Sequence, residues 1–213
     1  MFSNDPKSLK DCEIIYISHD TPTNNSNVSN YNFIENLISK TTKYLNKNSI
    51  MVIMCQAYPG FTEKIKWKKE KLFYQVETLI FGKAIQRAIN PEQIIIGKSY
   101  NCKKKTIKTL ENFIKKFSKN IKYMSYKSSE LSKIAINLYL SSSITYANAM
   151  AELCEKIGAS WSEIEEILRK DKRIGAHAYL KPGLGILSGN LQRDIVISEK
   201  LFKKTNSKSN FIS

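Results

Sequence analysis

The sequence is poor in cysteine, histidine and arginine, and each shortage argues against a class of protein. Its four cysteines are scattered over 213 residues without a CxxC pair, which argues against a disulfide framework and a zinc site. The only histidines, His19 and His177, lack ligand spacing, so we predict no metal site. This usage predicts a protein of a reducing compartment, which we take to be the cytoplasm.

Glycine and proline are also scarce, at eight and five residues, which excludes collagen-like and proline-rich disordered chains. No apolar run approaches the roughly 18 residues that a membrane-spanning helix needs. The first residues show neither the basic nor the apolar region of a secretory signal. With 42% hydrophobic and 25% charged residues, the composition predicts a globular chain of one or two domains without a membrane partner.

The net charge of +15 comes almost entirely from lysine, because arginine occurs only at positions 87, 169, 173 and 193. Readout of base edges favours the fixed fork of arginine, whereas lysine runs such as residues 103–105 are typical of a solvated surface. We therefore consider nucleic acid an unlikely partner and keep a nucleic-acid-binding protein only as an alternative. A weaker attraction for phosphate-bearing ligands stays open.

Short apolar runs alternate with amphipathic segments over the first 127 residues. Apolar runs typical of buried strands occupy residues 12–17, 50–55, 94–97 and 121–124. Helical spacing of apolar residues falls at 33–45 and 107–117, and the lysine-rich segment after Pro59 and Gly60 is also expected to be helical. This alternation predicts an α/β layer with parallel strands and right-handed crossovers.

The pattern becomes continuously helical from residue 129 to residue 157 and stops at Gly158. Such a helix would be about 40 Å long, more than one small domain covers, so its apolar positions predict a homodimer. Ser160 and Glu163 predict a capping box at the start of the next helix. We expect one domain at residues 1–127, a helical domain at 128–200 and a flexible tail at 201–213.

Three features carry candidate chemistry. Lys133 and Asn137 lie four residues apart on one helix face and can present an amine and an amide to an anion or a developing oxyanion, although the pattern alone favours an ordinary solvated face. The glycine-rich stretch 182–189 lets backbone N–H groups approach a phosphate or a sugar, or is a plain connecting loop. Thr21 follows a strand, at the end where α/β sheets bind ligands.

Eight stretches in a fixed order resemble the UDP-glucose/GDP-mannose dehydrogenase family. The family carries the patterns VPTP, STVLPGTT, NPEFLREG, NPDRIVIG, AELIKYANN, NEIAELCE, DxRIG and PGxGFGGSCFPKD. The matching stretches here are residues 19–23, 55–62, 77–82, 90–97, 129–137, 148–155, 171–175 and 182–194. The resemblance spans about residues 11–196, and eight matches in register make chance a poor explanation.

The resemblance implies an N-terminal NAD-binding Rossmann domain, a central helical domain that dimerises through its long helix, and a C-terminal nucleotide-binding domain. Residues 1–127 would be the C-terminal half of the Rossmann-like, parallel-sheet domain, and residues 128–200 the mainly helical central domain. The first βαβ unit, with its dinucleotide glycine fingerprint, would be absent. We therefore expect weak or no binding of NAD by this chain alone.

The resemblance also implies chemistry, namely oxidation of the C6 alcohol of UDP-glucose or a related nucleotide sugar to the acid through two hydride transfers to NAD. A cysteine of the family forms a thiohemiacetal and then a thioester. Carried over by position, the catalytic residues are Lys133, Asn137, Asp194 and Glu77. The cofactor-binding residues are Thr21, Gln56 and Glu77. The substrate-binding residues are Lys133, Asn137, Tyr179, Gly183, Gly185 and Gly189.

One departure from the family pattern decides the expected activity. Asn190 stands at the position of the cysteine, and because an amide is not a nucleophile of this kind, the thioester route is closed. We therefore expect a truncated and impaired nucleotide-sugar dehydrogenase-like protein that at most oxidises the alcohol to the aldehyde. The alternative is a non-catalytic homodimeric scaffold, or a subunit that complements a complete dehydrogenase.

Overall fold

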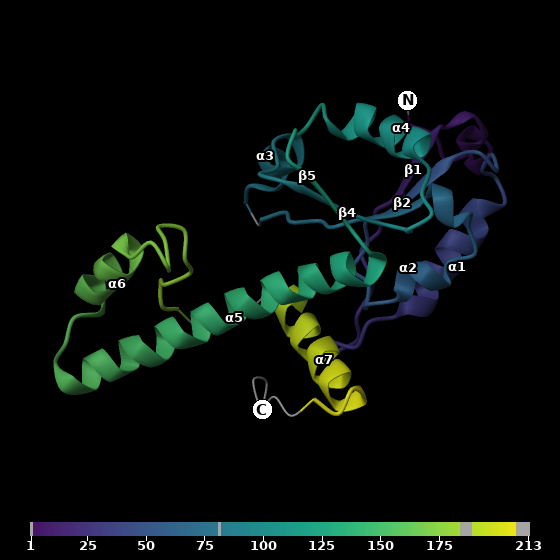
Figure 1. Cartoon of the computed structure of the whole chain (residues 1–213). Helices are drawn as coiled ribbons and strands as arrows, with labels where there is room; N and C mark the ends of the chain where they lie inside the picture. The colour runs from purple at the N-terminus through teal and green to yellow at the C-terminus, as the bar shows by residue number, and fades with distance from the viewer. Residues whose placement is uncertain (1, 81, 184–188, 208–213) are drawn as a thin grey trace. The chain divides into compact units, whose positions relative to one another are not determined.

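The computed structural model describes residues 2–80, 82–183 and 189–207. The chain divides into two compact units, Met1–Lys133 and Ile134–Ser213. The division falls inside a single long helix, α5, which spans Tyr126–Ile157 and is drawn in green in Figure 1. This confirms the predicted long helix, which begins three residues earlier than its apolar pattern indicates.

A five-stranded sheet forms the centre of the first unit. Its strands are β1 (Ile14–Ile17), β2 (Ile50–Ile53), β3 (Leu72–Gln75), β4 (Ile94–Lys98) and β5 (Ile121–Met124), and they lie side by side in chain order. The pairs β1–β2, β2–β3 and β4–β5 are parallel. The pair β3–β4 is antiparallel, with Tyr74 opposite Gly97. The sequence prediction of an α/β layer is confirmed, but the sheet is mixed rather than wholly parallel.

The sequence prediction misses β3, which follows the lysine-rich segment that is expected to be helical. Helix α2 (Phe61–Lys64) has a single turn, the 3-10 turn η2 (Lys69–Lys71) follows, and the chain then enters the sheet. Only three apolar residues in a row, Leu72 to Tyr74, mark this strand, which is too short a signal beside so many lysines. The missed strand supplies the antiparallel pairing.

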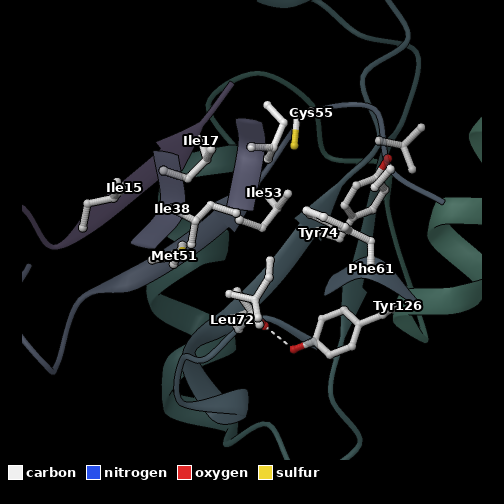
Figure 2. Packing of buried hydrophobic residues seen from close by; sticks show 14 of the residues in the cluster. Ile15, Ile17, Ile38, Met51, Ile53, Cys55, Phe61, Leu72, Tyr74 and Tyr126 are labelled. Atoms are coloured by element: carbon white, nitrogen blue, oxygen red, sulfur yellow. Dashed lines mark hydrogen bonds between the residues drawn. The ribbon is translucent and has the colours of Figure 1, made fainter. Parts of the chain in front are cut away.

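Helices cover both faces of the sheet because side chains alternate along each strand. Met51 and Ile53 face a core that includes Ile34 and Ile38 of α1 (Tyr31–Thr42), whereas Ile50 and Val52 face α4. Figure 2 shows the first core at close range, and Figure 1 shows α1 and α4 (Lys104–Ile114) on opposite sides of the strands. The short elements η1 (Pro6–Asp11) and α3 (Ala84–Ile89) complete this unit.

The first turn of α5 is anchored to the sheet. The Tyr126 hydroxyl donates to the carbonyl of Leu72 at 2.7 Å, a bond drawn in Figure 2. Gly97 on β4 allows the Ser129 side chain of the helix to come close, because a Cβ atom at position 97 would lie 2.0 Å from Ser129 Oγ. The position of the helix start is therefore set by contacts within the first unit.

The second unit contains the rest of α5, helix α6 (Trp161–Lys170) and helix α7 (Gly189–Lys204). Its core gathers Ala147, Cys154, Trp161 and Leu180, and the Trp161 indole donates to the Leu180 carbonyl at 3.0 Å. The predicted capping box is wrong, because the Ser160 hydroxyl pairs with Ser162 Oγ and makes no capping bond. The predicted domain limits stay predictions, although α7 enters the expected tail by four residues, 201–204.

Among the residues that the structure describes, no helix has the length and apolar character needed to cross a bilayer.

Candidate functional site

Three of the predicted site residues follow the carboxyl ends of adjacent parallel strands. Thr21 follows β1, Gln56 follows β2 and Glu77 follows β3. The Thr21 hydroxyl donates to the backbone carbonyl of Gln56 at 2.8 Å, and both residues are buried. The fold thus joins two of the predicted cofactor residues across neighbouring strands. Their role at a cofactor stays a prediction.

Glu77 and Lys133, both predicted to be catalytic, form an ion pair. Lys133 Nζ lies 3.6 Å from Glu77 Oε2, and only 13% of the Lys133 side chain is exposed. The other carboxylate oxygen of Glu77 accepts from the backbone N–H of Leu79. The pair places a largely buried cation beside the end of β3, held against a carboxylate that the chain itself orients.

Sequence reasoning missed the role of Glu130, which lies one helical turn before Lys133. Its side chain is fully buried, and its two oxygens accept from the backbone N–H groups of Gly60 at 2.5 Å and Thr62 at 2.7 Å. Burial raises the pKa of the Glu130 carboxyl, and the bonds from Thr62 and Gly60 partly oppose that rise. The sequence did contain a signal: Glu130 is an acidic residue on the same helix face as Lys133, in a helix that is otherwise rich in apolar residues.

Asn137 and Asp194 form the corresponding polar pair of the second unit. The Asn137 amide donates to Asp194 Oδ2 at 2.5 Å, and Arg193 Nε lies 3.9 Å from the other carboxylate oxygen. Asp194 has no exposed surface. In this arrangement the carboxylate orients the Asn137 amide, since a group bonded so closely to a neighbour fixes its direction.

The glycine-rich stretch is described only at its two ends. The Gly183 N–H donates to Asn148 Oδ1 at 2.9 Å, and Tyr179 is 41% exposed. Gly189 and Asn190 are the first two residues of α7, and both are exposed. Gly185 lies outside the described residues, so its predicted contact with a substrate stays a prediction.

Two of the native cysteines, Cys55 and Cys154, are buried. Cys55 lies near the carboxyl end of β2, but burial raises the pKa of its thiol to about 12, which keeps it neutral at physiological pH. Cys154 is buried in the core of the second unit. All four cysteines are free, and the described part of the chain contains no group of three or more His, Cys, Asp or Glu residues that could hold a metal ion.

Comparison with known families accounts for this arrangement. The model of the NAD binding domain of the UDP-glucose/GDP-mannose dehydrogenase family matches residues 1–118, and the model of that family's central domain matches residues 127–213. The chain belongs to this family. The match confirms the resemblance found in the sequence, the Rossmann-like fold and, at the level of the family, NAD as the cofactor.

Curated relatives support the assignment. The UDP-glucose 6-dehydrogenase of Rickettsia typhi is 27% identical over 209 residues, which cover 94% of this chain and 47% of the relative. The UDP-glucose 6-dehydrogenase YwqF of Bacillus subtilis is 25% identical over 224 residues and is covered to 50%. The chain therefore spans about half the length of the relatives it matches.

Solved structures confirm the fold. A UDP-glucose dehydrogenase from Pyrobaculum islandicum superimposes with a TM-score of 0.85 at 20% identity, over 99% of this chain and 51% of that one. A UDP-D-ManNAc dehydrogenase from Pyrococcus horikoshii gives a TM-score of 0.81 at 19% identity. At these identities the likeness concerns the fold alone.

Proposed function

We propose that this chain binds a nucleotide sugar through residues of α5 and does not, by itself, oxidise that sugar to the acid. One observation carries the proposal: the polar pairs Lys133–Glu77 and Asn137–Asp194 are formed, while Asn190 stands where the family has its cysteine. The groups that would stabilise charge are thus held by polar partners, whereas the position that would form the covalent intermediate carries an amide.

Lys133 and Asn137 would act on the oxygen at C6 of the sugar. They lie four residues apart on a continuous helix, so helical geometry turns both side chains to one face. The lysine amine would stabilise negative charge that develops on the oxygen, and the Asn137 amide, oriented by Asp194, would donate a hydrogen bond. Glu77 would hold the amine in place until the substrate arrives.

The residues at the carboxyl edge of the sheet fit part of NAD. This edge is where α/β sheets bind dinucleotides, and Thr21, Gln56 and Glu77 would line it. No GxGxxG stretch, which holds the pyrophosphate at a helix N-terminus in Rossmann folds, occurs in the 213 residues. When bound, NAD would accept the hydride that leaves C6.

The second oxidation needs more than these residues supply. Conversion of an aldehyde to an acid through a thioester requires a thiolate nucleophile, and Asn190 offers an amide. We propose that any oxidation by this chain stops at the aldehyde, or that the chain serves the binding and assembly functions of the family without turnover.

Calorimetric titration of UDP-glucose and UDP-glucuronate tests the binding proposal. A charged hydrogen bond in a partly buried site contributes about 1.5–3 kcal/mol, so Lys133→Ala is expected to weaken binding about ten- to a hundredfold. Lys103→Ala is the control, because that side chain is 71% exposed and pairs only loosely with Glu70 at 3.5 Å. Equal losses in both variants with a steep salt dependence would instead indicate attraction by the overall charge. Absence of binding at millimolar ligand would contradict the proposal and favour the scaffold.

A second function, assembly as a homodimer, rests on the exposed face of α5. Apolar residues recur there at alternating intervals of three and four, the spacing of a helix–helix seam. With Ser143 completing the spacing, the seam consists of the exposed Ile136, Tyr139, Tyr146, Leu153 and Ile157 and of Met150, which is partly buried against the core of the second unit. Tyr139 and Ile157 are 66% and 67% exposed, which is unusual for large side chains in register. We propose that a second copy of the chain covers this seam.

A further inference from the structure

The geometry points to Glu130 as a positioning residue for Lys133: by clamping the first turns of α5 to the turn that contains Gly60, it holds the lysine amine beside Glu77. The inference deepens the proposed function, because it concerns the same amine that we propose to meet the sugar.

The Glu130 carboxylate clamps α5 to the turn that contains Gly60. Glu130 bridges two backbone N–H groups, one oxygen to Gly60 and the other to Thr62. Gly60 has a φ of 93° and is the N-cap residue of α2, and as a glycine it has no side chain that could accept a hydrogen bond from the first turn of that helix. The carboxylate of Glu130 satisfies donors that the turn cannot satisfy locally. A two-point bridge to rigid backbone fixes both the height and the rotation of the helix that carries it.

The stability of the fold alone does not explain why the Glu130 carboxylate is buried. Replacing a buried charged group with an apolar side chain of similar volume is often neutral or stabilising, and burial raises the pKa of this carboxyl. Such a group is well suited to specifying one arrangement among several. In this chain the specified arrangement is the position in which the first turns of α5 pack against the sheet and the turn at Gly60.

The position of α5 on the sheet determines the position of Lys133. Tyr126, Ser129 and Glu130 contact the sheet and the turn at Gly60, and Lys133 follows on the same face at the next turn. Its amine lies 3.6 Å from Glu77, which belongs to a different part of the chain. An amine about 6 Å from the helix axis moves by about 1.5 Å for every 15° of helix rotation. A loose clamp would therefore separate the pair.

Carbon-13 methylation of the lysine amines gives a direct readout of this separation. The resonance of Lys133 is assigned by its loss in Lys133→Arg, and in the wild-type background Glu77→Gln is expected to move it. When Glu130→Gln is also present, the change that Glu77→Gln causes in the Lys133 resonance should be less than half of the change seen in the wild-type background. The exposed Glu155→Gln, on the same helix, is the control and should leave the shift unchanged. Titration of UDP-glucose into the same proteins should show about tenfold weaker binding for Glu130→Gln.

The outcomes separate the inference from the proposed function. An undiminished shift in folded Glu130→Gln protein overturns the positioning role. A lost shift with unchanged affinity for UDP-glucose supports the positioning role and contradicts the proposed contact of Lys133 with the sugar. If Glu130→Gln does not fold, Glu130→Asp decides, with an intermediate shift expected and a shift of wild-type size overturning the inference. If neither Glu130→Gln nor Glu130→Asp folds while Glu155→Gln does, Glu130 has a purely structural role, and that result would also overturn the inference.

Discussion

At the scale of single residues, position 190 lies in the first turn of α7. The N-terminal end of a helix favours negative charge, and thiols placed there lose their proton more readily than free cysteine does. Position 190 therefore has a backbone setting suited to a thiolate, although its side chain is an amide. Substitution at this one position can test the setting without altering the rest of the chain.

We expect Asn190→Cys to create a reactive thiol. A pKa about one unit below the usual value of ~8.5 would raise the rate of alkylation by iodoacetamide at pH 7 nearly tenfold. The matched control is Lys204→Cys, at the exposed opposite end of the same helix, where the dipole disfavours a thiolate. Peptide mapping by mass spectrometry separates these thiols from the native cysteines. Equal alkylation rates at the two ends would contradict the prediction.

Glu130 gives a second prediction at this scale, in the pH dependence of stability. Burial raises the pKa of its carboxyl above the ordinary 4.5. Between 4.5 and the raised value the folded chain keeps a proton that the unfolded chain has released, so the free energy of unfolding falls as pH rises through that window. Glu130→Gln removes this titration.

Urea denaturation of wild type and Glu130→Gln at several pH values from 4 to 8 measures the effect. The difference in unfolding free energy, wild type minus variant, should decrease as pH rises. Glu155 is exposed, so Glu155→Gln should show an almost constant difference over the same range. A constant difference for Glu130→Gln as well would contradict the assignment of a raised pKa.

At the scale of secondary-structure elements, α5 serves both compact units. Its first turns are fixed to the sheet by Tyr126, Ser129 and Glu130. Its later turns contribute Ala147 and Cys154 to the core of the second unit. The proposed seam runs along these later turns, and two of its residues, Tyr146 and Met150, also contact the core of the second unit.

We expect the protein to be a dimer at tens of micromolar, and Leu153→Lys to dissociate it. Two copies of this leucine, one from each chain, would contribute about 3 kcal/mol, so the dimer dissociation constant should rise roughly a hundredfold. Glu155→Lys introduces a lysine two residues away on a different face and should leave the dimer intact. Light scattering at several concentrations measures both, and a monomeric wild-type protein at these concentrations would contradict the seam.

At the scale of the whole molecule, the family assignment and the length of the match have to be considered together. Models for two successive domains of the family match residues 1–118 and 127–213, while the chain spans about half of its curated relatives. Family membership therefore describes the fold and the cofactor class of this chain. The activity of the complete relatives remains a proposal for it.

We expect the purified chain to produce no uronate from UDP-glucose and NAD. The family's thioester route needs a thiolate where this chain has Asn190, and no GxGxxG stretch occurs in the sequence. Absorbance of NADH and chromatography of the sugar nucleotide measure the outcome, with the Bacillus subtilis enzyme YwqF as the active control. Two equivalents of NADH per sugar would contradict the prediction, whereas one equivalent would show that oxidation stops at the aldehyde.

The sequence by itself determined the features that depend on local pattern. Apolar runs predicted β1, β2, β4 and β5, and helical spacing predicted α1, α4 and α5, because burial on one or two faces leaves a period in the chain. The order of eight short motifs identified the family. These signals survive substitution, since they depend on residue type and spacing rather than on particular contacts.

Only the tertiary structure decided which distant groups meet. The antiparallel position of β3 depends on a neighbouring strand whose paired residues lie 21 to 25 positions later in the sequence, rather than on its own three apolar residues. The bonds of Glu130 to Gly60 and of Asn137 to Asp194 join groups separated by 70 and 57 positions. Ser160 and Glu163 have the spacing of a capping box, but the Ser160 hydroxyl pairs with Ser162 Oγ and makes no capping bond. Hydrogen bonds select partners by distance and direction in space, and a linear pattern carries neither.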